Sequence, residues 1–180
     1  MIAIVPIGDV DSTLLDYLQQ NLEKIFNTKF VIERKIDIPQ SSYNPQRGQY
    51  MAEKFLESLI LNFRKSNYDK ILGITDLDLY VPNLNFVFGL ASAIGGRYCV
   101  VALKRLYPEF YGGNPNDSLF KVRALKECVH ELGHCFGLHH CNNPKCVMFF
   151  SNSIWDTDRK SYNFCDKCRK LIENEIKKQR

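Results

Sequence analysis

Eleven residues in the C-terminal half of the chain have the types and spacing needed to bind a metal and use it in hydrolysis. They run from His130 to His140 and form the pattern H-E-x-x-H-x-x-G-x-x-H. Successive residues of a helix are rotated by about 100°, so His130 and His134 project from one face and can hold the same ion. Glu131 borders that face without having to bind the metal, which suits a general base acting on metal-bound water.

Gly137 and His140 complete this pattern. Gly137 can adopt the left-handed conformation that ends a helix, after which the chain can turn and bring His140 back as a third ligand. Three imidazoles leave a fourth position on zinc for water, as in catalytic sites. H-E-x-x-H alone occurs by chance in many helices, but the added glycine and histidine make chance a poor explanation. Spacing alone does not exclude His139 in place of His140, although we expect it to be a supporting or surface group.

Four cysteines form a second candidate metal site. They are Cys141, Cys146, Cys165 and Cys168. Four thiolates can enclose one zinc ion tetrahedrally and leave no position for water, which is the arrangement of a structural site. We therefore expect two zinc ions per chain, one catalytic and one structural. The alternative is four unligated neighbouring thiols, which would be reactive.

The whole pattern reads H-E-x-x-H-x-x-G-x-x-H-C-x(4)-C-x-M, followed downstream by C-x(2)-C. It closely resembles the archaemetzincin family of the metzincin metallopeptidases. The matching motif spans His130 to Cys168, and the cysteine-bearing extension is specific to that family. Residues 73–80 and 84–89 are also similar to the family, so the resemblance covers most of the chain, more loosely before residue 70.

The resemblance implies roles for residues outside the two ligand sets. Met148 resembles the methionine that packs beneath the catalytic zinc of metzincins. Residues 86–89 resemble the edge strand that pairs with extended substrate, a case of strand addition to an open sheet edge. Several metzincin families have a tyrosine at the position of Phe150 that stabilises the oxyanion. Here that donor is unassigned, and Tyr80, Asn152 or a backbone N–H are the candidates.

These features predict a zinc-dependent metallopeptidase in which Glu131 activates the zinc-bound water, with peptides or disordered protein segments as substrates. The alternative is a zinc-scaffolded peptide- or protein-binding module with a weak or vestigial catalytic site. Glu131 favours the enzyme, because a binding module needs no carboxylate there. Nucleic-acid binding through the cysteine site is a weaker hypothesis, since few basic residues alternate with aromatic ones near it.

Length and composition indicate one domain in an ordinary globular protein. The chain has 180 residues, of which 45% are hydrophobic and 24% charged, with a net charge of +4. No apolar run approaches the roughly 18 residues of a membrane helix, and residues 1–8 predict a first strand rather than a signal peptide. Seven cysteines in such a chain favour metal binding over disulfides. We therefore expect a cytoplasmic monomer that binds neither membranes nor nucleic acid.

Hydrophobic patterns predict the elements that position the two sites. The alternation of strands and helices predicts an α/β fold with a twisted, mostly parallel sheet and covering helices, which agrees with the zincin-like fold that the resemblance implies. The active-site helix should begin at a cap formed by Asp117 or Ser118. Strands are expected near residues 2–7, 30–38, 70–74 and 98–103, and helices near 12–26, 48–65, 118–136 and 165–178.

We expect a single catalytic domain, residues 1–180, with two subdomains. Residues 1–137 contain the active-site helix, and residues 138–180 form a small subdomain stapled by the four-cysteine zinc site. The segment 138–163 lacks a long periodic pattern, so its order should come from the metal and from packing around Phe149, Phe150 and Trp155.

Overall fold

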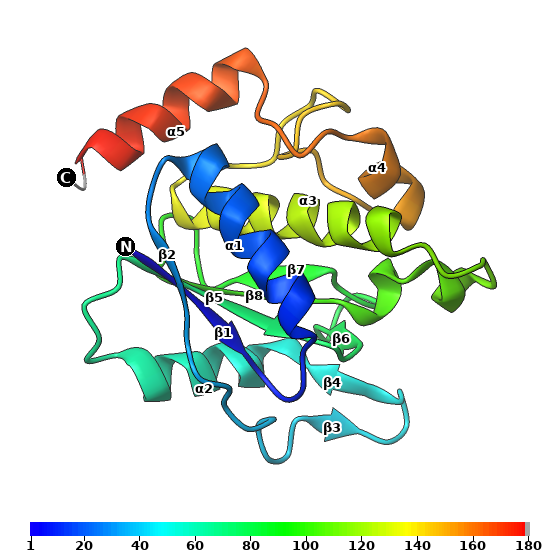
Figure 1. The fold of residues 1–180 in the computed structure, drawn as a ribbon. Helices are drawn as coiled ribbons and strands as arrows, with labels where there is room; N and C mark the ends of the chain where they lie inside the picture. The colour runs from blue at the N-terminus through cyan, green and yellow to red at the C-terminus, as the bar shows by residue number, and fades with distance from the viewer. Residues whose placement is uncertain (179–180) are drawn as a thin grey trace.

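A five-stranded sheet in the order β2-β1-β5-β8-β7 forms the middle layer of the computed structural model, which describes residues 1–178 (Figure 1). All neighbouring pairs are parallel except β7 with β8. The three central strands are buried along their whole length, because helices cover both faces. The strands are Ile2–Pro6 (β1), Phe30–Ile32 (β2), Lys70–Thr75 (β5), Gly89–Ala91 (β7) and Tyr98–Ala102 (β8). The predicted mostly parallel α/β architecture is confirmed.

Helices α1 (Ser12–Phe26) and α3 (Asp117–Cys135) pack on one face of the sheet, and α2 (Ala52–Phe63) packs on the other (Figure 1). Asp11 caps α1, where its carboxylate accepts a hydrogen bond from the Thr13 N–H at 2.7 Å. Apolar residues at helical spacing are buried on the inner face of both α1 and α2, as their periodicity predicts. None of the helices within residues 1–178 is long and apolar enough to cross a membrane.

A second, three-stranded sheet lies beside the first, where the sequence predicted a helix start. It consists of Tyr43–Asn44 (β3), Gln49–Met51 (β4) and Leu79–Tyr80 (β6), in the order β3-β4-β6. The helix expected from residue 48 begins only at Ala52, because the preceding residues are extended and pair with β6. The strand expected over residues 30–38 ends at Ile32, and beyond it Ile36 forms an isolated bridge with Ile7.

The chain after α3 folds back over that helix and ends in α4 (Ile154–Arg159) and α5 (Asp166–Lys178). Its apolar residues join the same core as α1 and α3, as shown by the contact of the Phe164 and Phe26 rings at 6.0 Å between centroids. The expectation that Phe150 and Trp155 order this segment is wrong, because they are 42% and 74% exposed. Residues 179–180, at the end of the expected subdomain 138–180, lie outside the described residues.

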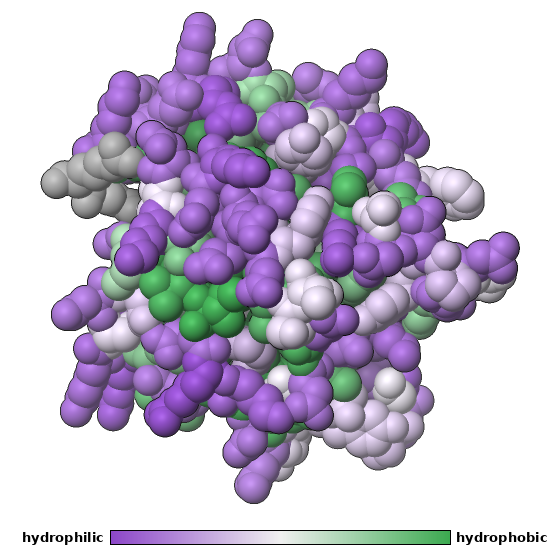
Figure 2. All heavy atoms as spheres, viewed as in Figure 1, coloured by the Kyte–Doolittle hydropathy of each residue, from purple (hydrophilic) through white to green (hydrophobic). Residues whose placement is uncertain are grey.

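The outer face of the molecule is mostly hydrophilic in the view of Figure 2, with one hydrophobic area over strands β1 and β2. Beneath the surface, α1 contributes side chains that are completely inaccessible to solvent, among them Leu18. Such positions should dominate the stability of the layer formed by α1, α3 and the sheet.

Leu18→Ala should lower the free energy of unfolding by about 2–5 kcal/mol, because it removes buried apolar atoms and leaves a cavity. Gln20→Ala in the same helix is the matched control, since Gln20 is exposed. Urea unfolding of both variants measures the difference. Equal midpoints would show that α1 is not packed as described.

Candidate metal centres and active site

Helix α3 carries His130, Glu131 and His134, and its two ends are fixed by hydrogen bonds. At the start, the Asn116 side chain accepts a hydrogen bond from the Leu119 N–H at 3.0 Å. The expected caps, Asp117 and Ser118, lie inside the first turn instead, so that prediction is wrong by one or two residues.

The end of α3 is a Schellman turn at Gly137. The Gly137 N–H donates to the His134 carbonyl at 2.9 Å, and the Leu138 N–H donates to the Gly133 carbonyl at 3.0 Å. Gly137 has a φ of 92°, in the left-handed region that side chains with a Cβ rarely adopt. The chain therefore reverses one turn after His134 and brings His140 back toward the helix.

Three imidazoles meet at this reversal. One ring nitrogen each from His130, His134 and His140 lies within 4.8 Å of the others. The Nε2 atoms of His130 and His134 are 3.1 Å apart. The opposite nitrogens face backbone carbonyls, with Nδ1 of His130 at 2.8 Å from the Val147 oxygen and Nδ1 of His134 at 2.8 Å from the Leu138 oxygen. His139 is not in this cluster, so the structure favours His140 as the third ligand.

These hydrogen bonds assign the tautomers of the first two rings. A carbonyl only accepts, so each Nδ1 carries the proton and each Nε2 presents a lone pair. Burial lowers the pKa of His130 well below its usual value and also lowers the pKa of His134, which keeps both rings neutral. Two facing lone pairs repel unless a cation lies between them. A tetrahedral zinc ion with bonds of about 2.0–2.1 Å would hold two nitrogens about 3.3 Å apart, so the site fits zinc.

Glu131 lies between these histidines and the edge of the sheet. It is buried, and it lines a cleft of about 220 Å³. Burial, followed by the negative charge of Glu127, raises the pKa of the Glu131 carboxyl well above its usual value. A Cβ added at Gly89 would lie 2.7 Å from its Oε1 atom, so the glycine makes room for the carboxylate. Glu131 is thus placed beside the imidazoles and facing the cleft, where a proton acceptor is needed.

The cleft is lined by residues 84–89 and so reaches the first residue of strand β7, which is the end strand of the five-stranded sheet and has one free edge. The Phe88 carbonyl accepts a hydrogen bond from the Ala102 N–H of β8 at 2.9 Å, and the Ser92 N–H donates to the Tyr98 carbonyl of β8 at 2.8 Å. In an antiparallel ladder bonded pairs alternate, so the N–H and C=O of Gly89 and Ala91 point outward. The strand expected over residues 86–89 is therefore misplaced. Residues 86–88 precede the strand, because the Val87 N–H bonds to the Leu79 carbonyl at 2.9 Å and draws this segment toward β6.

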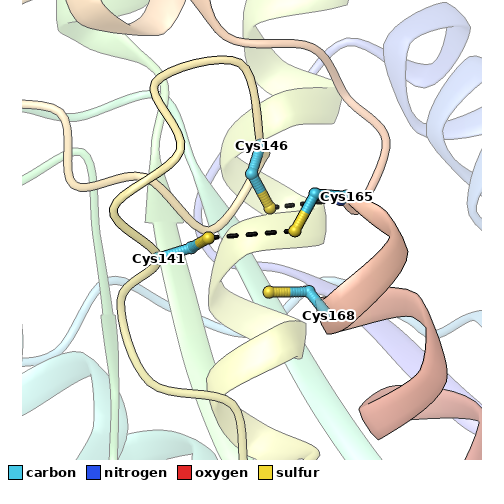
Figure 3. A group of neighbouring side chains, drawn as sticks. All are labelled: Cys141, Cys146, Cys165 and Cys168. Carbon is cyan, nitrogen blue, oxygen red and sulfur yellow. Dashed lines mark hydrogen bonds between the residues drawn. The ribbon is translucent and has the colours of Figure 1, made fainter.

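The four predicted cysteines converge on one point beside the end of α3 (Figure 3). The Sγ atoms of Cys141 and Cys165 are 3.8 Å apart, close to the spacing of about 3.8 Å for two sulfurs on a tetrahedral zinc with bonds of about 2.3 Å. Cys146 Sγ accepts a hydrogen bond from the Cys165 N–H at 3.3 Å. Cys168 completes the set from the first turn of α5. The donor set and its geometry fit a closed structural zinc site.

Comparisons with known proteins identify the family of the chain. The model of peptidase family M54 matches residues 6–174. The chain belongs to this family, the archaemetzincins. It is 48% identical to an archaemetzincin of Pyrococcus furiosus over 98% of this chain and 94% of that one, and 45% identical to one of Methanocaldococcus jannaschii over 96% and 93%. The family assignment makes the chain a zinc metallopeptidase, and therefore a hydrolase.

Solved structures show the same fold. The crystal structure of archaemetzincin from Methanopyrus kandleri superposes with a TM-score of 0.85 at 37% identity and covers 98% of this chain and 96% of its own. That of Archaeoglobus fulgidus archaemetzincin, complexed with malonate, gives a TM-score of 0.81 at 37% identity, with coverages of 95% and 99%. The fold predicted from the resemblance is confirmed at the level of the whole chain.

Met148 packs against helix α3 at Gly133, between the first two histidines of the candidate metal site. It is fully buried, and a Cβ on Gly133 would lie 2.4 Å from its sulfur. The glycine inside the H-E-x-x-H sequence is thus required for the close approach of Met148 to α3. The Met148 carbonyl also accepts a hydrogen bond from the Cys141 N–H at 2.9 Å, which connects Met148 to the four-cysteine cluster.

Sequence reasoning missed a buried ion pair beside the cleft. Lys160 is completely buried, and its Nζ lies 3.2 Å from an oxygen of Glu127, which lines the cleft with His130. The Thr157 hydroxyl donates to the same oxygen at 3.0 Å. Glu127 lies one turn before Glu131 on α3, so the sequence already places the two carboxylates on one face of the helix. Lys160 lies in the segment without periodicity, and nothing local marks it.

Of the two side chains considered as oxyanion donors, Asn152 and Tyr80, only one lies in the cleft. Asn152 lines the cleft, so it remains a candidate. Tyr80 is not among the cleft residues, and its hydroxyl accepts a hydrogen bond from the Asn44 side chain at 3.0 Å. The three other cysteines, Cys99, Cys128 and Cys135, are fully buried in the core.

Gly89→Ala should displace the Glu131 carboxylate while the zinc ligands stay in place. We expect the turnover rate to fall about 10²-fold with unchanged zinc content, because a misplacement of about 1 Å has that cost at a reacting centre. Peptide cleavage and metal analysis check this, with Ser92→Ala, at the exposed residue just after the same strand, as control. Normal turnover in Gly89→Ala would show that Glu131 does not need its present position.

Cys165→Ser should remove one zinc ion per chain and loosen residues 138–178 far more than the sheet, because structural zinc contributes folding free energy directly. Metal analysis and hydrogen exchange measure the two effects. Lys167→Ser is the matched control, since Lys167 is exposed and lies between Cys165 and Cys168. A variant that keeps its zinc and its protected tail would rule out the cysteine site.

Proposed function

We propose that this chain hydrolyses peptide bonds at a site where His130, His134 and His140 hold a zinc ion and Glu131 is the general base. The observation that carries the proposal is the pair of unprotonated Nε2 atoms 3.1 Å apart, with the Glu131 carboxylate beside them in the cleft. When bound, zinc supplies a Lewis acid that polarises the scissile carbonyl and lowers the pKa of a water molecule.

Glu131 performs the proton transfers. Its carboxylate accepts a proton from the attacking water and then delivers it to the nitrogen of the leaving amine. The raised pKa of this buried carboxyl suits the second step, because a carboxylic acid must form before it can donate. Gly89 keeps the carboxylate at the edge of β7, so that proton transfer and substrate binding occur at the same place.

Strand β7 binds the substrate. An extended peptide can add to its free edge through the outward N–H and C=O groups of Gly89 and Ala91. Such pairing uses only main-chain groups, and it therefore selects extended peptides or disordered protein segments over folded ones. The Asn152 amide lies in the cleft and is a candidate donor to the oxyanion.

A second zinc ion at the four cysteines has a structural role in this proposal. Residues 138–178 contain few regular elements, and the cysteine site joins the loop after α3 to the start of α5. We infer one catalytic domain in which this zinc-stapled segment forms a small subdomain on residues 1–137. Thiolate ligands persist in a reducing compartment, which supports a cytoplasmic location, and we propose that the protein acts there as a monomer.

Glu131→Gln keeps the size and polarity of the side chain but removes the base. We expect cleavage to fall by about 10²–10⁴-fold while zinc content and peptide affinity persist. The measurement is cleavage of a diverse peptide library by both proteins at matched zinc content. Glu109→Gln, at an exposed carboxylate outside the cleft, is the control.

Equal cleavage by the wild type and Glu131→Gln would show that Glu131 is not the base. Peptide binding without cleavage by either protein would favour a binding module with a vestigial site. Neither the described geometry nor the family assignment favours that alternative.

A further inference from the structure

A second cavity continues the catalytic cleft beyond Phe86 and Asn152, which line both. Its volume is about 410 Å³, nearly twice that of the cleft. One wall is formed by Ile154 and Trp155 of α4, and the other by Arg105 and Tyr111 of the loop before α3. Figure 1 shows α4 and this loop at the same end of α3. We call this cavity the distal pocket.

Trp155 is the feature of the distal pocket that packing does not explain. At 74% exposure it is the most exposed large hydrophobic side chain of the described residues, and it is the single tryptophan of the chain. A large aromatic residue exposed next to a cleft is characteristic of binding surfaces, because it offers contact area at a low entropic cost.

The helix that presents Trp155 is held rigidly. Asp158 accepts two hydrogen bonds from Arg123, both at 2.7 Å, and Thr157 binds Glu127 of α3. Lys126 donates to the Thr157 carbonyl at 2.9 Å. These polar contacts of α4 go to α3 and fix the helix, and Trp155 lines the distal pocket together with Arg123 while most of its side chain stays exposed.

The charges in the distal pocket are already matched. Arg105 forms a two-point contact with Asp78 at 2.7 and 2.9 Å, and its guanidinium lies 4.4 Å from the centre of the Phe86 ring. Arg123 is satisfied by Asp158. With both arginines paired, the pocket suits an uncharged aromatic or bulky apolar group rather than an anion.

The edge strand β7 determines in which direction a bound peptide runs through the cleft. The Glu131 side chain contacts the strand at Gly89. Phe86, three residues earlier in the chain, lines the distal pocket. A peptide antiparallel to β7 passes this segment with its C-terminal part toward Phe86. At about 3.4 Å per residue, the pocket lies two or three residues beyond the scissile bond.

We propose that the distal pocket binds an aromatic or bulky apolar side chain of the substrate, at the second or third residue C-terminal to the scissile bond. Trp155 is then a specificity-determining residue that stacks against this side chain. The inference rests on the proposed peptidase function and adds a substrate class to it.

The test uses zinc-loaded wild type, Trp155→Ala and, as control, Leu61→Ala, which removes a 69% exposed side chain on α2. Each protein is given a library of decapeptides without tryptophan, and the products are sequenced by mass spectrometry. We expect Phe, Tyr and Leu to be enriched two or three residues after the cleaved bond with wild type and Leu61→Ala. Trp155→Ala should raise KM for the Phe peptides about three- to tenfold and leave their Ala counterparts unchanged.

A binding measurement accompanies cleavage. In Glu131→Gln, the emission of Trp155 should shift and saturate with a decapeptide pool that contains Phe, and respond more weakly to a pool in which Phe, Tyr and Leu are replaced by Ala. Three results would overturn the proposed role of the distal pocket and leave the peptidase function intact. They are a preference that survives Trp155→Ala, the absence of any preference at these positions, and an emission that bound peptide does not change. Absence of cleavage by wild type would count against the proposed function, and the emission measurement alone would then decide the inference.

Discussion

The site depends on two imidazole nitrogens that face each other 3.1 Å apart without a proton between them. This arrangement exists because the backbone carbonyls of Val147 and Leu138 accept hydrogen bonds from the other two ring nitrogens and so hold the protons there. Both carbonyls belong to the segment after α3, so the helix alone does not make the site. The reversal at Gly137 positions the Leu138 carbonyl and returns His140, and a bound cation would offset the repulsion of the lone pairs.

Everything else in the C-terminal half secures that segment against α3. Met148 packs into the space left by Gly133, and the buried Lys160 pairs with Glu127, which lines the cleft. The cysteine site joins the loop after the third histidine to α5. On the other side of the helix, the sheet contributes its edge, and Gly89 allows that edge to approach the Glu131 carboxylate. One helix is thus held between a rigid strand and a segment with little regular structure.

The predictable parts of this fold are those encoded over short distances. Helix α1 spans residues 12–26, as its apolar spacing predicts. The residues of both candidate metal clusters could also be named, because each cluster contains short motifs with characteristic spacing. The shift of the edge strand to Gly89–Ala91 was not predictable, since it depends on a bridge between Val87 and Leu79. The hydrophobicity of Trp155 predicts that it packs in a core, but the residue is exposed. Hydrophobicity alone does not show that α4 is attached to α3 through polar side chains such as Thr157.

The most direct measurement is a crystal structure of the zinc-loaded chain with anomalous data collected on both sides of the zinc absorption edge. We expect two peaks, one about 2.0–2.1 Å from Nε2 of His130 and His134 and from a ring nitrogen of His140, and one about 2.3 Å from four cysteine sulfurs. The Nδ1 atoms should keep their bonds to Val147 and Leu138. A single peak, or a histidine bound through the nitrogen that now faces a carbonyl, would contradict this arrangement.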